Sequence, residues 1–175
     1  MESKAKIFGH SIHQMLIVFP LGLLATSLAF DIAFLSTRDT TFAMVAYYMI
    51  FAGICGGLLA AVFGLIDWLA IPSHTRAKAI GGWHGAGNLI VVLLFLASCI
   101  SRYPAPEAPS SGAITCSVIG VLLALVTGWL GGELVTRLGV GVDPGANLNS
   151  PSSLSGRPAS DAQIPIAQNP GTHHA

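Results

Sequence analysis

The chain has 175 residues, of which 53% are hydrophobic and only 9% charged, and its formal net charge at pH 7 is zero. A soluble domain carries about 25% charged residues, so this composition excludes a water-soluble globular protein and indicates a lipid bilayer as the main contact. The balanced charge and the lack of a Lys/Arg-rich run argue against a nucleic-acid partner. The sequence contains no hydrolase or nucleotide-binding motif, so these two classes of activity have no support. Whether the chain is an enzyme of another class stays open.

Four long apolar runs follow a polar N-terminal lead, residues 1–11. Each run has the ~20 residues that cross the hydrocarbon core of a bilayer. Pro20 interrupts the first run and predicts a kink there, because proline lacks the amide hydrogen that would bond the preceding turn. We therefore predict an all-α fold, an antiparallel bundle of four transmembrane helices within residues 12–142. The expected spans cover residues 12–35, 42–70, 83–101 and 113–135.

Small residues recur at helical spacing in the second and fourth spans, where they predict close helix packing. They are Gly53, Gly57, Ala60, Ala61 and Gly64 in the second span, and Gly120, Ala124, Gly128 and Gly132 in the fourth. After Gly141 the composition changes abruptly to Pro, Ser, Asn, Gly and Ala. Residues 143–175 carry too few apolar side chains to bury a core, so we expect a disordered C-terminal tail.

The distribution of basic residues predicts the orientation. An even number of spans places both termini on one side, together with Lys4, Lys6, Arg76, Lys78, Arg137 and Arg157. The other side carries Arg38 and Arg102, and its half of the bundle is expected to be apolar, with Asp31 at the interface. The positive-inside rule then predicts a multi-pass membrane protein with both termini cytoplasmic.

Four ionisable residues gather at the terminal side of the predicted bundle. His13 and His84 lie near the starts of the first and third spans, and Asp67 and Glu133 near the ends of the second and fourth. Four-helix bundles build metal and cofactor sites from such inward-facing side chains. Asn88 and Arg137 are predicted to support them, since each lies one turn from a member of the group.

Two kinds of site fit this group. In one, His13 and His84 are the axial ligands of haem b and the carboxylates orient the imidazoles. In the other, both histidines and one or both of Asp67 and Glu133 bind a non-haem metal ion such as iron or zinc. Covalent haem attachment is excluded as a motif match, because the chain has no Cys-x-x-Cys-His sequence.

Two other interpretations, a structural role and a transport role, compete with a redox or metal-binding module. The polar residues lie near span ends, where they can reach water, and Glu133 can pair with Arg137. The chain would then be a structural or assembly subunit, in a homo-oligomer or a larger membrane complex. Alternatively, a His/acid group in a membrane can carry protons or coordinate a transported ion.

The chain resembles the bacterial four-helix membrane family known as domain of unknown function 2231 (DUF2231). The resemblance lies in His13-Gln-Met-Leu-Ile-Val-Phe-Pro20, Gly64-Leu-Ile-Asp-Trp68, His84 with Asn88, and Gly128-Trp-Leu-Gly-Gly-Glu-Leu-Val135 followed by Gly139-Val-Gly-Val142. It implies four spans in a bacterial cytoplasmic membrane and a grouping of His13, Asp67, His84 and Glu133, and it brings no established activity. Val18 and Leu138 stand where the family pattern has further histidines, which puts a site built on those imidazoles in doubt.

Overall fold

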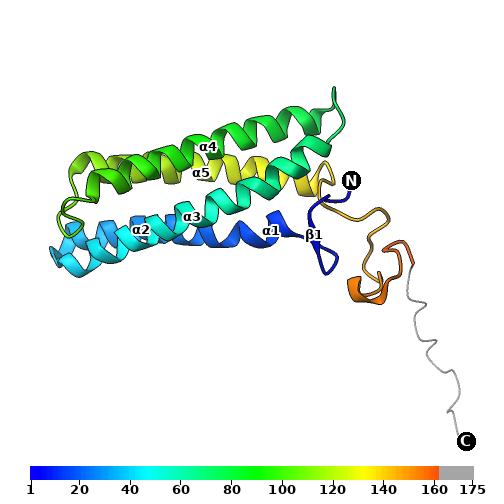
Figure 1. Cartoon of the computed structure of the whole chain (residues 1–175), viewed down its shortest axis with the longest axis horizontal. Helices are drawn as coiled ribbons and strands as arrows, with labels where there is room; N and C mark the ends of the chain where they lie inside the picture. The colour runs from blue at the N-terminus through cyan, green and yellow to red at the C-terminus, as the bar shows by residue number, and fades with distance from the viewer. Residues whose placement is uncertain (162–175) are drawn as a thin grey trace, which may run out of the picture.

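The computed structural model describes residues 1–161 and is dominated by four long helices that run alternately up and down (Figure 1). Each is long and apolar enough to cross a membrane. This confirms the predicted all-α, antiparallel four-helix architecture. The helices extend beyond most ends of the expected spans and comprise α1 (Ile12–Leu16) with α2 (Val18–Thr37), α3 (Thr40–Ala70), α4 (Arg76–Arg102) and α5 (Ser111–Thr136).

The first span is divided into α1 and α2 by a break at Ile17. The break lies three residues before Pro20, which cannot donate a backbone hydrogen bond to the carbonyl of Leu16. The chain still continues in one direction, since Leu21 N–H bonds the carbonyl of Ile17 at 3.2 Å. The proline thus separates the short helix α1 from the long helix α2, which continues the same span.

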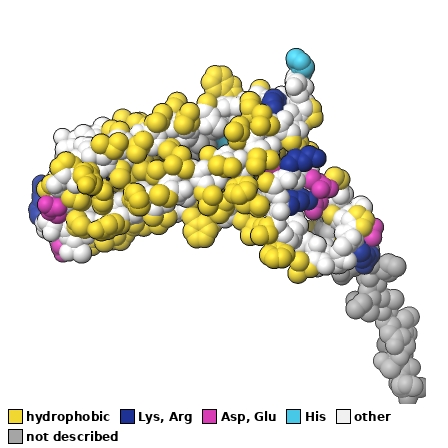
Figure 2. Space-filling model, in the orientation of Figure 1, with side chains coloured by type: hydrophobic (Ala, Val, Ile, Leu, Met, Phe, Trp, Pro, Cys, Tyr) yellow, Lys and Arg dark blue, Asp and Glu magenta, His cyan; other side chains and the backbone are white. Residues whose placement is uncertain are grey.

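The bundle is assembled from two helical hairpins. The closest helix pairs are α2 with α3 and α4 with α5, and the hairpins meet where α3 packs on α4 and α2 on α5. As a result α2 and α4 lie diagonally opposite. The buried centre is apolar and comprises Leu24, Ile50, Ile54, Val91, Phe95 and Cys99. Hydrophobic side chains also cover most of the face of the bundle that Figure 2 shows, as a bilayer requires.

Glycines permit the closest helix approaches. A Cβ at Gly53 would lie 2.6 Å from a Leu24 methyl carbon, and one at Gly120 would lie 2.8 Å from the Phe95 ring. The predicted small-residue seam of the fourth span holds only in part. Among the described residues, nothing lies within 4 Å of a Cβ placed on Gly128 or Gly132, so these two glycines lie on an open face.

The end of the bundle remote from the termini is not apolar, contrary to expectation. Asp31 on α2 is fully buried between the helices, and its carboxylate accepts two hydrogen bonds of 2.7 Å from the guanidinium of Arg102 on α4. Ser98 and Ser117, also buried, accept further bonds from the same guanidinium. Burial of a charge in an apolar interior requires such a partner, so the pair joins the two diagonal helices.

The chain outside the spans lies mostly at the other end. The N-terminal lead forms a small antiparallel hairpin, β1 (Lys6–Ile7) with β2 (His10–Ser11), immediately before α1. After α5, residues 137–161 form turns and one 3-10 helix, η1 (Ser153–Ser155). The part of the predicted tail that comprises residues 162–175 lies outside the described residues.

Candidate functional site

The structure brings the two predicted histidine ligands together. His13 on α1 and His84 on α4 have ring centroids 6.4 Å apart, with ring planes at 89°. Because α1 continues into α2, the two imidazoles meet across the same diagonal as the Asp31–Arg102 pair, at the opposite end. We call His13 and His84 the histidine pair.

His13 is held by the helix that packs against it. Its Nδ1 lies 2.8 Å from the backbone carbonyl oxygen of Ala60 on α3. The imidazole can lie this close to the helix because residue 64, one turn farther along α3, is glycine. A Cβ at Gly64 would lie 2.8 Å from the Cε1 atom of His13, well inside van der Waals contact.

His84 is held in the same way by α5. Its Nδ1 lies 2.9 Å from the carbonyl oxygen of Thr127, and a Cβ at Gly131, one turn farther along, would lie 3.1 Å from its Cε1 atom. Asn88 adds a lateral contact, because its amide group donates to the His84 carbonyl and accepts a bond from the Thr127 hydroxyl. Asn88 therefore lies one turn from His84 and beside its ring.

The two contacts define which ring nitrogen is available for chemistry. A carbonyl oxygen can only accept, so Nδ1 of each imidazole carries the proton and donates it. In the neutral ring this leaves the lone pair on Nε2, and metal-binding histidines are typically oriented by just such a bond from the other nitrogen to a carbonyl or carboxylate. The histidine pair thus offers two Nε2 atoms of fixed tautomer, and that of His84 also lies 3.3 Å from the amide nitrogen of Asn88.

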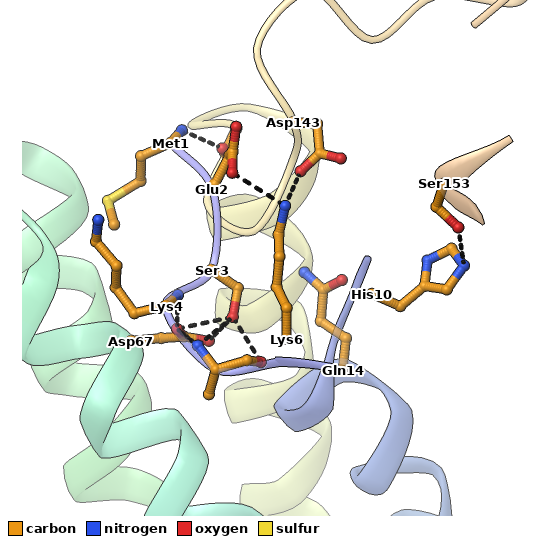
Figure 3. A network of polar contacts seen from close by, with 12 residues as sticks. Met1, Glu2, Ser3, Lys4, Lys6, His10, Gln14, Asp67, Asp143 and Ser153 are labelled. Carbon is orange, nitrogen blue, oxygen red and sulfur yellow. Dashed lines mark hydrogen bonds and ion pairs between the residues drawn. The ribbon is translucent and has the colours of Figure 1, made fainter. Parts of the chain in front are cut away.

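Asp67, a predicted member of the group, is engaged by the N-terminal lead (Figure 3). The Ser3 hydroxyl lies 2.8 Å from both carboxylate oxygens, and the backbone N–H groups of Lys4 and Ala5 donate to Oδ1 at 2.7 and 3.4 Å. Both Asp67 and Ser3 are buried. The carboxylate therefore anchors the start of the chain to the end of α3, and Ser3 is a residue that the sequence did not single out.

Glu133 also has a partner of its own. Its carboxylate lies 2.7 Å from the guanidinium of Arg76 at the start of α4. The expected pairing with Arg137 is wrong: Arg137 ends α5 with an exposed side chain and contacts Glu133 through its backbone N–H. Within residues 1–161, no three His, Cys, Asp or Glu side chains are grouped so that they could hold a metal ion.

The N-terminal lead is fixed at further points across this end of the bundle. The Met1 amino group donates to the Gly139 carbonyl at 2.7 Å, and Gly141 N–H returns a 2.8 Å bond to the Met1 carbonyl. Lys6 pairs with Asp143 and with Glu2. The Asp143 carboxylate holds the pKa of the Lys6 ammonium above its usual value. Figure 3 shows this network lying over the ends of α3 and α5.

A family model described as predicted membrane protein (DUF2231) matches residues 9–144. The chain belongs to the DUF2231 family. The matched region covers all four spans and both members of the histidine pair, which confirms the resemblance seen in the sequence. No curated protein matches the chain, and no solved structure does. The DUF2231 assignment makes the chain a multi-pass membrane protein and attaches no activity to it.

Proposed function

We propose that this DUF2231 protein is a redox module that binds haem b between His13 and His84. The observation that supports this most strongly is that both imidazoles are held through Nδ1 by backbone carbonyls, at 2.8 and 2.9 Å, with their ring centroids 6.4 Å apart. Two imidazoles are a complete axial ligand set for haem iron. A four-coordinate non-haem ion would need ligands beyond these two.

The two rings lie close enough to serve one cofactor. Their centroids are 6.4 Å apart with perpendicular planes, so His13 and His84 are the residues that would hold the haem iron. Haem would supply one-electron transfer. The chain would hold the imidazoles, exclude water through the apolar core, and tune the iron through the bonds to Ala60 and Thr127.

The two departures from the family pattern leave this pair intact. Val18, in place of a family histidine, is 60% exposed on a membrane-spanning helix and so faces lipid. Leu138 follows α5, outside the spans. Neither position lies between His13 and His84, so the absence of imidazoles there removes no member of the pair.

The same proposal includes the bacterial cytoplasmic membrane, with both termini in the cytoplasm. The basic residues on the terminal side outnumber those on the other side, where Arg102 is buried with Asp31 rather than free in a loop. The positive-inside rule counts such loop residues. Expression of reporter fusions at either terminus and in the α2–α3 turn would test the orientation.

The absorption spectrum of gently purified protein, oxidised and reduced, tests the haem proposal. We expect a Soret band and reducible α and β bands, with about one haem per chain. His13→Ala and His84→Ala should each remove the low-spin spectrum, because one axial ligand is lost. The matched control is His74→Ala, whose imidazole is exposed in the α3–α4 loop and should leave the spectrum unchanged.

Three other outcomes would contradict haem binding by the histidine pair. Stoichiometric metal without a Soret band would indicate a non-haem site on the histidine pair. Folded protein that neither contains haem nor takes up added hemin would favour a structural or assembly subunit. Haem that survives the double change of His13 and His84 would place the cofactor elsewhere.

Proton or ion transport is the second candidate, and the Asp31–Arg102 pair is the observation that favours it. With this pair and the histidine pair, both ends of the bundle interior are polar. Intramembrane ionisable groups often mark such paths. The apolar layer of Ile50, Ile54 and Phe95 separates the two ends, so the transport proposal requires this layer to open. Dye-reported proton flux in proteoliposomes would distinguish the two candidates.

A further inference from the structure

Helix α1, which carries His13, is only five residues long and continues into α2 through a weakened turn. Pro20 has no N–H group to donate to the carbonyl of Leu16, so the backbone hydrogen bonding is interrupted around Ile17. No side chain of α1 is fully buried. Proline breaks and the ends of elements are the usual hinge points of helices. Contacts from outside the span therefore contribute to holding α1, and with it His13, in place.

The N-terminal lead provides such contacts as it crosses the end of the bundle. Met1 is bonded to Gly139 beyond α5, and the N–H groups of Lys4 and Ala5 donate to Asp67 on α3 (Figure 3). The packing order of the bundle places α3 and α5 on one diagonal and α2 and α4 on the other. The lead thus runs along the α3–α5 diagonal, whereas the histidine pair lies along the other one.

The lead also lies directly next to His13. The His13 imidazole packs against α3 at Gly64, and Asp67 follows Gly64 by three residues. Residues three apart share a helix face, so Asp67 and the backbone that it binds adjoin the imidazole on the terminal side. The carbonyl of Ala5 accepts a 2.9 Å bond from Ile12 N–H, immediately before His13 in the chain.

The segment after α5 completes the hold on α1. The side-chain amide of Gln14 lies 3.4 Å from the Val140 carbonyl and occupies the space where a Cβ at Gly141 would lie. Gly141 N–H in turn donates to the Met1 carbonyl at 2.8 Å. Residues 139–143 and the lead therefore bind each other, and both bind α1.

The lead can be released without disturbing the bundle core. Ser3 is the one buried residue among residues 1–6. These residues are held by hydrogen bonds and ion pairs rather than by packed apolar side chains. Segments with few buried apolar contacts open locally at a low free energy.

We propose that the N-terminal lead is a latch for α1. While the lead is bound to Asp67, His13 is held opposite His84; when the lead is released, α1 turns about the break at Ile17 and opens the histidine pair. A ligand larger than an ion cannot pass between close-packed helices, and this movement gives it a route from the end of the bundle. The proposal concerns the position of His13 and holds whichever ligand the pair takes.

The reactivity of the histidines with diethyl pyrocarbonate tests the latch. The reagent attacks the unprotonated nitrogen of a neutral imidazole, which is Nε2 in both members of the pair. The full chain in nanodiscs, freed of any bound cofactor, would be treated, and peptide mass spectrometry would measure the rate at each site. His74, which is exposed, is the internal reference. We expect His13 in the unaltered chain to react at least about tenfold more slowly than His74.

Asp67→Ala should raise the rate at His13 by about tenfold or more, since each lost hydrogen bond to the carboxylate favours the open state by about that factor. The rate at His84 should rise with it, because the movement of α1 uncovers its ring. The matched control is Glu133→Ala, which removes a carboxylate at the same end that is bonded to Arg76 and not to the lead; it should leave both rates unchanged. Slow alkylation of Cys99, which is buried in the core, shows that the bundle stays folded.

Two results would overturn the proposal: a rate at His13 equal to that at His74 in the unaltered chain, or a rate at His13 that Asp67→Ala leaves unchanged. If Asp67→Ala also makes Cys99 reactive, Lys6→Gln decides, because it removes only the outer pairs of Lys6 with Asp143 and Glu2. That variant must raise the rate at His13 several-fold with Cys99 unaffected, or the proposal fails. The absence of a Soret band would contradict haem binding and leave these rates as they are, so the two proposals fail separately.

Discussion

A single local device fixes each imidazole of the histidine pair. A glycine on the neighbouring helix allows the ring to approach, and the carbonyl one turn earlier accepts the Nδ1 proton, in one case with Gly64 and Ala60 and in the other with Gly131 and Thr127. The glycine contributes space and the carbonyl contributes orientation. The position of each ring therefore depends on a residue with no side chain.

Gly64→Ala should displace His13, because the added methyl carbon would lie 2.8 Å from the ring. Overpacking of this kind costs about 1–3 kcal/mol, which is to be measured as a decrease in the free energy of unfolding by titration with SDS. The matched control is Gly128→Ala, where the described residues leave open space around the Cβ. That variant should be neutral or more stable by up to about 1 kcal/mol, since alanine favours helix. Equal losses in both variants would show that Gly64 makes no special contact.

Two elements depend on buried charge for their placement. The Asp31–Arg102 pair joins α2 to α4 at the end remote from the termini, and Asp67 anchors the N-terminal lead to α3 at the other end. Each carboxylate is buried and fully provided with donors. Removal of a donor from such a group is costly because the remaining charge has neither water nor a partner.

Arg102→Ala should reduce the free energy of unfolding by about 3–5 kcal/mol, because Asp31 is left buried and unpaired. The double variant with Asp31→Ala should lose less than this single change. Arg76→Ala is the matched control, since Arg76 is 61% exposed in its pair with Glu133 and exposed pairs contribute up to about 1 kcal/mol. A double variant as unstable as the sum of its singles would contradict the assignment of a coupled pair.

Asp67→Ala should release the N-terminal lead while leaving the bundle folded. The variant removes the acceptor for Ser3, Lys4 and Ala5, and each hydrogen bond to a charged acceptor contributes about 1.5–3 kcal/mol. We expect faster hydrogen exchange of the amides of residues 2–7 by mass spectrometry. Amides in the middle of α3 should be unaffected, and a uniform increase along α3 would instead indicate that Asp67 supports the helix itself.

Most of the architecture of the whole molecule could be predicted from the sequence. Four apolar runs of sufficient length determine four helices, and their even number brings His13 and His84 to one end. The partners of the acidic side chains could not be predicted, because helix rotation and the course of the N-terminal lead decide whether Asp67 meets a metal or Ser3. A signal for the Asp31–Arg102 pair was present: opposite charges near the ends of two spans on one side, but 71 residues apart in sequence.

The repeated histidine device means that each helical hairpin prepares its own half of the pair. His13 docks on α3 within the first hairpin, and His84 docks on α5 within the second. Either imidazole can thus acquire its tautomer and orientation as soon as its hairpin forms, before the two hairpins meet. The two oriented imidazoles come together only when the hairpins associate. A ligand bound to both histidines would therefore show that the bundle is fully assembled.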